Sequence, residues 1–326
     1  DQFLLALNKL WVDGEFPDTW RTSTLIPILK NNKPPTDPAS YRPISLSSCA
    51  SKILERMVND RIRVHLETNN HLSQNQNGFR PARCTADNLI QIIDSVQVGF
   101  QNKEVTQALF LDLKAAFDTV HHSSLLIKIH KAGIRGRLAT YIKNFITNRT
   151  FSVRCGNTYS QSSDQQHGVP QGSPLSPTLF LILINDVFEE LPTITSKLNF
   201  SLYADDLAIW ISHQSVDITN NKIQHALDSV QEWCQRWGLQ ISAKKSASLI
   251  FSQKFKYVAP RLPLVVNGQI IPQVKTFKYL GLTLDRKLTF NAHIADLRQR
   301  CSRRLNVIKC LQGAKWGADR RTLLCM

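Results

Sequence analysis

The spacing of hydrophobic and polar residues divides the chain into short strands and amphipathic helices. Apolar side chains that recur every three or four positions predict a helix, and a short continuous apolar run predicts a strand. On this basis, helices are expected at 47–66, 85–100, 125–131, 137–148, 176–191, 223–237 and 292–309. The apolar face of the first helix would comprise Ile53, Leu54, Met57, Val58 and Ile62. Gly238 would cap the helix at 223–237.

The strands are shorter and separated by turn residues. "QALFLDL" at 107–113 is almost continuously apolar, which predicts a central strand with both faces covered. Glycine next to asparagine between apolar residues is typical of a tight hairpin turn. Strands or hairpins are therefore expected at 23–30, 107–113, 151–160, 202–210 and 262–272, with a proline-rich loop at 31–40. Helices between strands of mixed direction predict an α+β fold.

Charge favours a polyanionic partner. The chain has 326 residues, with 40 Lys and Arg against 25 Asp and Glu, and a formal net charge of +15. Such a balance suits nucleic acid or an anionic membrane. No apolar run reaches the roughly 18 residues that a membrane helix needs, so we expect nucleic acid and no membrane. Basic residues gather from 291 onward, which predicts a separate basic, helical subdomain there.

Cysteine usage indicates a reducing compartment. The seven cysteines are scattered and odd in number, and neither a C-x-x-C pair nor zinc-ligand spacing occurs among them. We therefore expect free thiols in an intracellular protein. Because the chain begins at Asp1 and ends at Cys325 and Met326, we interpret it as a piece of a longer polypeptide.

Three carboxylates stand at the ends or turns of apolar strands. Asp112 ends "LFLD", and Asp205 and Asp206 lie inside "FSLYADDLAIW". If neighbouring strands bring them together, they repel unless a cation neutralises them, and oxygen ligands select hard cations such as Mg²⁺. Two such ions about 3.5–4 Å apart can catalyse phosphoryl transfer. Alternatively, the acid pair is a simple polar turn and Asp112 caps a helix beginning near Lys114.

The stretch "HGVPQGSPLSP" at 167–177 is the third candidate feature. Gly168, Gly172 and three prolines fix a bent backbone, and small residues allow a base pair or another backbone to approach closely. Gln171 carries an amide that both donates and accepts hydrogen bonds. The alternative is an ordinary loop with a helix N-cap at Ser176.

Seven motifs together resemble the reverse transcriptases of non-LTR (LINE-like) retrotransposons, in particular the jockey-like elements of insects. In order they are "YRPISLSS", "QNGFRPARCTADN", "LFLDLKAAFDTV", "GVPQGSPLSPTLF", "YADD", "GLQISAKKS" and "KYLGLTLD". The resemblance implies a right-hand polymerase with fingers, a palm built on an antiparallel sheet and the start of a helical thumb. Its parts would be fingers at 1–106, palm at 107–120, a fingers and palm insertion at 121–166, palm at 167–290 and thumb from 291 to 326.

The same resemblance implies RNA-templated DNA synthesis with two Mg²⁺ ions, for which Mn²⁺ could substitute. Partners would be an RNA template, a DNA primer and dNTPs. An endonuclease upstream, and the rest of the thumb and a C-terminal region downstream, would belong to the same polyprotein. The implied location is the nucleus and a cytoplasmic ribonucleoprotein.

Site residues follow from the motifs by resemblance. Asp112, Asp205 and Asp206 match the metal-binding acids, and Leu113 would offer its backbone carbonyl to the second metal. The residues that match the dNTP site are Lys30 and Arg42 for the triphosphate, Phe117 for the sugar, Gln171 for the nascent base pair and Lys245 for the pyrophosphate. Lys244, beside Lys245, leaves that register open.

The resemblance also points to residues that contact template and primer. Arg80 would support either the fingers or the template strand. Tyr279, Leu280 and Gly281 match a hairpin that grips the primer end.

Two other functions remain open from the sequence. One is a decayed or domesticated module that binds RNA without catalysis, although binding alone does not require the three aspartates. The other is a different right-hand polymerase, such as a group II intron maturase or an RNA-directed RNA polymerase. Phe117 discriminates here, because an aromatic ring at the sugar would exclude a 2′-hydroxyl.

Overall fold

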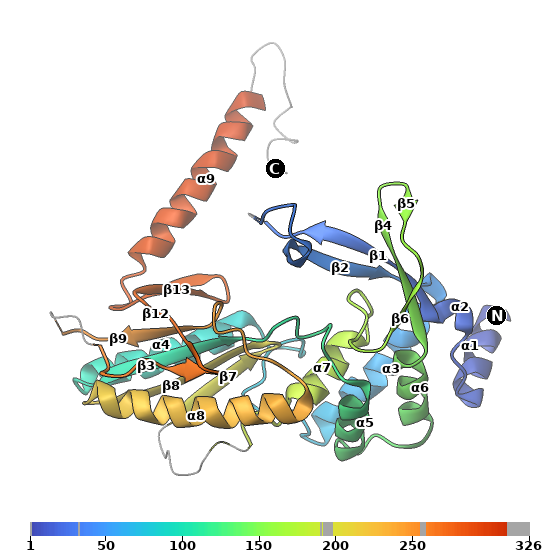
Figure 1. Cartoon of the computed structure of the whole chain (residues 1–326), viewed down its shortest axis with the longest axis horizontal. Coiled ribbons are helices and arrows are strands. Elements are labelled where there is room, and N and C mark those ends of the chain that lie inside the picture. Colours follow the sequence, from blue (N-terminus) through green and yellow to red (C-terminus); the bar gives the residue numbers. More distant parts are fainter. Residues whose placement is uncertain (1, 32, 190, 192–197, 255–258, 312–326) are drawn as a thin grey trace.

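A five-stranded sheet with the strand order β12-β9-β3-β8-β7 forms the centre of the molecule (Figure 1). The computed structural model describes residues 2–31, 33–189, 191, 198–254 and 259–311. β3 lies in the middle and pairs antiparallel with β8 and β9, whereas β12 pairs parallel with β9. The strands are β3 (Val105–Asp112), β7 (Asn199–Tyr203), β8 (Asp206–His213), β9 (Ala247–Phe251) and β12 (Gln273–Val274). The apolar segment expected at the centre of a sheet is confirmed as its middle strand.

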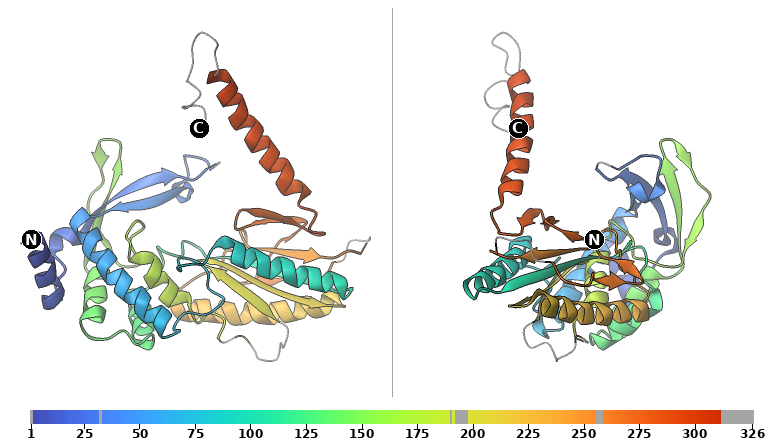
Figure 2. Two further views of the ribbon diagram at one scale, coloured as in Figure 1. Left: turned by 180° about the vertical axis from the view of Figure 1, so that it is seen from behind. Right: turned by 60° about the vertical axis from the view of Figure 1, so that its left-hand side comes forward.

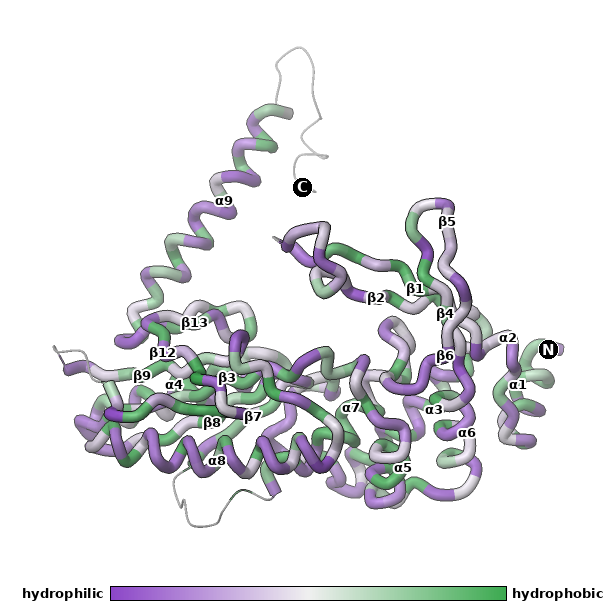
Figure 3. Tube along the Cα trace, viewed as in Figure 1, coloured by the Kyte–Doolittle hydropathy of each residue, from purple (hydrophilic) through white to green (hydrophobic). Residues whose placement is uncertain are grey.

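Both faces of this sheet are covered, which explains the continuous apolar character of β3. Leu109 and Leu111 point to a core shared with α8 (Val216–Trp237), while Phe110 packs on the other side with Ile92 of α4 (Thr85–Gln101). The two helices are seen on opposite sides of the sheet in Figure 2. α8 shows the alternation of hydrophobic and hydrophilic residues that its amphipathic sequence predicts (Figure 3). Gly238 ends it in the left-handed conformation, with φ of 77°, as expected.

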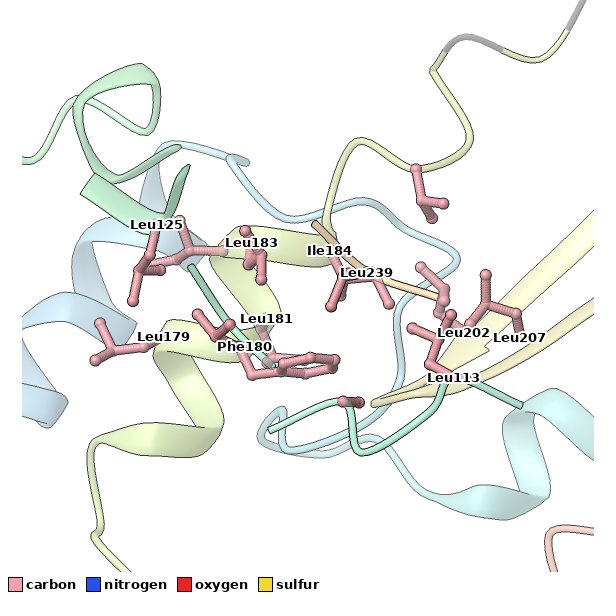
Figure 4. Close-up of a cluster of buried hydrophobic side chains, with 14 of the residues drawn as sticks. Leu113, Leu125, Leu179, Phe180, Leu181, Leu183, Ile184, Leu202, Leu207 and Leu239 are labelled. Carbon is pink, nitrogen blue, oxygen red and sulfur yellow. The ribbon is translucent and has the colours of Figure 1, made fainter. Parts of the chain in front are cut away.

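A helical body adjoins one end of the sheet. Its members are α1 (Gln2–Asp13), α2 (Asp18–Arg21), α3 (Cys49–Thr68), α5 (His122–Lys131), α6 (Gly136–Ile146) and α7 (Ser176–Ile184). α7 is apolar on all sides and buried among the others. Figure 4 shows Phe180 and Leu183 of α7 in one cluster with Leu113, Leu202 and Leu207, near the polar ends of the central strands. The sheet and the helical body therefore share one core.

A second sheet rises above the helical body. It has the order β2-β1-β4-β5, with β6 also paired to β4. β1 and β2 form a ribbon that extends over the end of the central sheet (Figure 1). The elements are β1 (Thr22–Leu29), the 3₁₀ helix η1 (Pro38–Ser40), β2 (Tyr41–Leu46), β4 (Arg149–Cys155), β5 (Thr158–Tyr159) and β6 (Ser163–Gln165).

The C-terminal part consists of two small hairpins and a long helix. The hairpins are β10 (Val265–Val266) with β11 (Gln269–Ile270), and β13 (Thr276–Tyr279) with β14 (Leu282–Asp285). α9 (Asn291–Leu311) stands away from the central sheet, across from the β1–β2 ribbon (Figure 1). Within the described ranges, none of the helices combines the length and apolarity needed to cross a membrane.

Most expected elements are confirmed within a few residues, including both hairpins with adjacent glycine and asparagine. The helix expected at 223–237 is α8, which begins seven residues earlier, at Val216. The helix expected at 176–191 is wrong in length, because α7 ends at Ile184. The next two side chains are engaged elsewhere: Asn185 bonds backbone atoms of His71 and Ser73, and Asp186 bonds Lys128 and Trp233. The chain continues there as turns.

The buried face expected for α3 is also partly wrong. Ile53 and Met57 are exposed, whereas Glu55 is buried in their place. The six cysteines in the described part of the chain are free thiols, as expected. Cys325 and the last basic residues of the sequence, Lys315, Arg320 and Arg321, lie outside the described residues.

Candidate active site

The three aspartates meet at one end of the central sheet. Asp112 is the last residue of β3 and stands opposite Asp206 of β8 in the strand register. Directly opposed residues of antiparallel strands project to the same face of a sheet. Asp205 lies beside them in the tight turn between β7 and β8, after Ala204, whose φ is 58°. The two acidic motifs are therefore brought together as the sequence predicts.

The pKa shifts of Asp205 and Asp206 reflect the proximity of the three carboxylates. Desolvation, together with the charges of Asp205 and Asp112, raises the pKa of Asp206 to about 6. Desolvation likewise raises the pKa of Asp205, and the nearby Asp112 adds to this effect. The charges of neighbouring carboxylates therefore add to desolvation at Asp205 and Asp206, while the Lys245 ammonium partly offsets the rise in the pKa of Asp205.

Lys245 supplies the nearest cation. Its Nζ lies 3.3 Å from Oδ2 of Asp112. The segment that carries it is tied to the end of β3, since Ser242 N donates to Asp112 O at 2.8 Å and Asp112 N donates to Ser246 Oγ at 3.2 Å. Lys245 and Ser242 line the cleft described below, whereas Lys244 is not among the described residues that line it.

A cleft of about 790 Å³ extends from the acid cluster to the β1–β2 ribbon. Asp112, Asp205 and Leu113 line one end, and Lys30 and Arg42 line the other. Phe117, Gln171 and Lys245 complete the set that the sequence assigned to the nucleotide site. Eight predicted residues from distant parts of the chain thus share one cavity. Asp206 is not among the described residues that line it, which separates it from the other two acids.

The cationic end of the cleft is built on the ribbon. Arg42 of β2 pairs with Ile28 of β1, and its side chain is exposed. Lys30 follows β1 directly, and its Nζ donates to Ala39 O at 2.9 Å. Both cations are therefore held over the sheet by a short ribbon with a proline-containing turn.

Phe117 lies between the two ends. Its ring stacks on Phe180 of α7 at a centroid distance of 4.6 Å and meets Phe79 edge-on at 6.4 Å. One face of the ring is therefore fixed by the core while the residue still lines the cleft. Phe117 serves both as a packing residue and as a wall of the cavity.

Gln171 faces the same space from the loop before α7. Its Nε2 donates to Asp118 Oδ1 at 2.7 Å, and Ser45 N of β2 donates to its backbone carbonyl at 2.7 Å. Asp118 lines the cleft and is a residue that the sequence reasoning missed. Its position immediately after Phe117 in "AAFDTV" is the signal that could have revealed it.

Arg80 lies inside the protein rather than in the cleft. Its guanidinium makes a bidentate bond to Glu67 and also donates to the carbonyls of Ser73 and Gln76. Its side chain is only 6% exposed. Of the two roles expected for Arg80, this geometry favours support of the fold over contact with a template.

The residues of the hairpin turn at 279–281 differ in their exposure to solvent. Tyr279 is buried, its ring lies 4.9 Å from that of Phe110, and its hydroxyl is 3.2 Å from Ser201 Oγ. Gly281 is exposed at the turn, next to Leu280. A nucleic acid can therefore reach the turn itself, whereas Tyr279 fixes the hairpin to the sheet.

The turn that carries Asp205 rests on residues 75–78, a support that the sequence reasoning missed. Gln76 is fully buried, and its Oε1 accepts hydrogen bonds from Gly78 N and Ala204 N. A Cβ added at Gly78 would lie 2.2 Å from Ala204 N, so only glycine fits there. The "QNGF" segment therefore sets the position of the acidic turn.

This close approach gives a testable prediction. We expect Gly78→Ala to displace the turn at Ala204, to lower stability by about 1–3 kcal/mol and to reduce activity further than that loss explains. Gly99→Ala is the matched control. Gly99 lies near the C-terminal end of α4, and a Cβ added there would lie 2.6 Å from the side chain of Thr106. Melting temperatures and nucleotide addition by the two variants should be compared. Equal activity at equal stability would show that the turn does not depend on Gly78.

The acid cluster fits a divalent cation by its chemistry. Oδ2 of Asp112 is buried and accepts no hydrogen bond within the described residues, although the Lys245 ammonium lies 3.3 Å from it. No three acidic, histidine or cysteine side chains in that part of the chain already converge as a metal cage. Mg²⁺ is normally held by one or two carboxylates together with water and substrate phosphates, so an open pair of aspartates suits it better than a closed cage.

The sequence matches one family over most of its length. Residues 28–284 match the family described as reverse transcriptase (RNA-dependent DNA polymerase). Among curated proteins, the chain is 34% identical over 302 residues to the RNA-directed DNA polymerase from mobile element jockey of Drosophila melanogaster. It is 33% identical to the probable RNA-directed DNA polymerase from transposon X-element of the same species. Each alignment covers 91% of this chain and 32% of the relative, so the chain spans about a third of their length.

Solved structures of telomerase share the fold. The telomerase of Candida albicans in complex with a fragment of telomeric RNA superposes with a TM-score of 0.59 at 12% identity, over 87% of this chain and 48% of that one. The apo telomerase of Candida tropicalis gives 0.56 at 13% identity, over 89% and 53%. The α+β fold is that of a right-hand polymerase, as expected. With its motifs in order and its acids at one sheet end, the chain belongs to the reverse transcriptase (RNA-dependent DNA polymerase) family.

Proposed function

We propose that this chain is the polymerase part of a non-LTR retrotransposon protein and synthesises DNA on an RNA template. One observation carries the proposal: Asp112 and Asp205 share a cleft with Lys30 and Arg42, and Phe117 and Gln171 lie between them. Acidic and basic groups at opposite ends suit metal-bound phosphates and the tail of a triphosphate, respectively. The names of the curated relatives point to the same activity.

The parts of a right hand can be assigned to the structure. The β1–β2 ribbon with α1, α2, α3, α5 and α6 would be the fingers, which corresponds to 1–106 and 121–166. The central sheet would be the palm, at 107–120 and 167–290, and α9 would begin the thumb at 291. This division is supported by the position of the cleft, which lies between the ribbon and the sheet.

Binding of the incoming dNTP would use the residues along the cleft. Lys30 and Arg42 would hold the triphosphate, since a planar guanidinium and an ammonium both donate to phosphate oxygens. The Phe117 ring would lie under the sugar and leave no room for a 2′-hydroxyl. Gln171, held by Asp118, would lie along the nascent base pair.

In the reaction, the primer 3′-hydroxyl would lose its proton to water, and its oxygen would attack the α-phosphorus of the dNTP. The bond from the α-phosphorus to the β-phosphate bridging oxygen breaks, and pyrophosphate leaves. Asp112 and Asp205, with the Leu113 carbonyl, would hold two Mg²⁺ ions, which supply charge stabilisation of the attacking and leaving oxygens. Lys245, whose Nζ lies 3.3 Å from Oδ2 of Asp112, would give a proton to the leaving pyrophosphate. Asp206, outside the cleft lining, would contribute less.

Template and primer would lie against α9 and the 279–281 turn. We expect their affinity to fall steeply with salt, because Lys and Arg contacts release counterions from phosphates. Neutralising Arg303 and Arg304, both exposed on α9, should lower the slope of log affinity against log salt by about 1 per lost contact. Neutralising Arg137 and Lys143 of α6 removes the same charge far from α9 and is the control. A slope that is equal in both variants would exclude α9 as a surface that follows the backbone.

The proposed partners extend beyond this chain. RNA template, DNA primer and dNTPs would bind here, while an endonuclease upstream and the remaining thumb and C-terminal region downstream would complete the protein. We propose that it acts in the nucleus and travels in a cytoplasmic ribonucleoprotein.

The test measures binding and nucleotide addition on the same sample. Template–primer binding by fluorescence anisotropy and extension of a labelled DNA primer on RNA with Mg²⁺ should both be positive. Binding without extension would support a non-catalytic RNA-binding module. A longer chain with the complete thumb is the necessary control, since an incomplete grip on the primer gives the same result.

A further inference from the structure

The loop before α7, which carries Gln171, is attached to its surroundings at several points. Val169 N donates to Phe117 O at 2.9 Å, and Ser45 N donates to Gln171 O at 2.7 Å. His122 Nε2 bonds the carbonyl of Gly168 at 2.9 Å. These contacts fix the front of the loop, on the side of the cleft.

A carboxylate fixes the loop from behind. Glu55 of α3 is 1% exposed, and both of its oxygens are occupied by serine hydroxyls. Ser51 Oγ, one turn earlier on the same helix, donates to Oε1 at 2.5 Å. Ser173 Oγ, two residues after Gln171, donates to Oε2 at 2.5 Å. Ser173 Oγ also accepts a hydrogen bond from Leu175 N at the start of α7.

Burial of this charge is compensated from within the protein. Arg149 is 2% exposed, with its guanidinium bonded to the carbonyl of Phe145. Burial lowers the pKa of Arg149, and the nearby Glu55 carboxylate opposes that shift. A hydrogen bond to an ionised group is shorter and stronger than a neutral one, so the Glu55 carboxylate holds the Ser173 hydroxyl more firmly than a neutral acceptor would. An apolar residue at position 55 would fill the space without orienting the Ser173 hydroxyl.

We propose that Glu55 is a positioning residue for nucleotide selection. Through Ser173 it fixes the backbone of 171–173, and thereby the position of Gln171 beside the incoming base pair. The inference rests on the proposed function, in which Gln171 contacts that base pair. It assigns a role to a residue on the helix behind the cleft, outside the set that contacts substrate.

The two serines provide a matched pair of variants. Ser51→Ala and Ser173→Ala each remove one hydroxyl from the same carboxylate, but only Ser173 belongs to the loop. We expect Ser173→Ala to raise the KM for dNTP by about five- to tenfold while kcat changes less. Ser51→Ala should leave the KM for dNTP within about twofold of the wild-type value. It should lower the melting temperature by about as much as Ser173→Ala does.

Glu55→Gln tests the carboxylate itself at nearly constant volume. We expect it to raise the KM for dNTP as Ser173→Ala does, because a neutral amide binds the Ser173 hydroxyl more weakly than a carboxylate does. The double variant should be no worse than either single one, because both changes act on the same contact. Equal KM effects of Ser51→Ala and Ser173→Ala, or additive effects of Glu55→Gln and Ser173→Ala, would overturn the proposal.

Hydrogen exchange separates this inference from the proposed function. Amides of 171–175 should exchange faster in Ser173→Ala and Glu55→Gln than in Ser51→Ala, whether or not the chain extends primers. Unchanged exchange in this segment would refute the positioning role. A wild-type chain that extends no primer while the exchange pattern holds would instead refute the proposed function.

Discussion

Replacement of Asp112 or Asp205 by asparagine is expected to abolish primer extension while template–primer binding survives. Each change keeps the size of the side chain but removes a negative charge from the acidic end of the cleft. Metal stabilisation of the transferring phosphate is worth several kcal/mol, so we expect a loss of about a thousandfold or more. Single-nucleotide addition under saturating dNTP, together with anisotropy for binding, measures both effects.

Variants of two further aspartates serve as comparisons for this result. Asp206→Asn should have a smaller effect, because Asp206 does not line the cleft with the other two acids in the described residues. Asp228→Asn on the exposed side of α8 also removes one charge and should leave extension unchanged. Near-normal extension by Asp112→Asn or Asp205→Asn would exclude a two-metal site at these aspartates.

Phe117→Ala is expected to weaken discrimination against ribonucleotides by roughly ten- to hundredfold. The ring is held from behind by Phe180, at a centroid distance of 4.6 Å, so it cannot retreat from a 2′-hydroxyl. Removal of the ring opens that space. The ratio of kcat/KM for dTTP to that for UTP on an RNA template expresses the change directly.

Phe117→Tyr retains the ring and is the control, for which we expect a ratio close to that of the wild type. An unchanged ratio in Phe117→Ala would show that the ring does not exclude ribonucleotides. A wild-type preference for UTP would indicate an RNA-directed RNA polymerase.

The sequence predicts β3, β7 and β8 of the central sheet because their pattern is physically unambiguous, whereas β9 and β12 were not expected. β3 and β8 alternate between two apolar cores, so their side chains show no polar face, and the acids at their ends stand out. The ordered motifs then identify Asp112 and Asp205, although they lie 93 positions apart in the chain. The same pattern predicts Leu54, Val58 and Ile62 of α3 as buried correctly, but it does not predict the burial of Glu55. Glu55 counts as a surface residue until its partner Ser173 is known.

Supporting contacts were missed for the same reason. Gln76 and Asp118 act through single hydrogen bonds to residues far along the chain, Ala204 and Gln171, and hydrophobic spacing carries no signal for such pairs. Tyr279 shows the opposite case. Its motif suggests a surface that contacts the primer, yet its ring packs on Phe110 because the hairpin lies flat on the sheet.

We propose that the cleft between the acids and the ribbon catalyses RNA-templated DNA synthesis. Addition of one labelled dTMP to an oligo(dT) primer on poly(rA) tests it most directly, with and without Mg²⁺, by this chain and by a longer one with the complete thumb. We expect Mg²⁺-dependent addition of dTMP, with release of one pyrophosphate per nucleotide added. Tight binding of template and primer with no addition by either chain would contradict it.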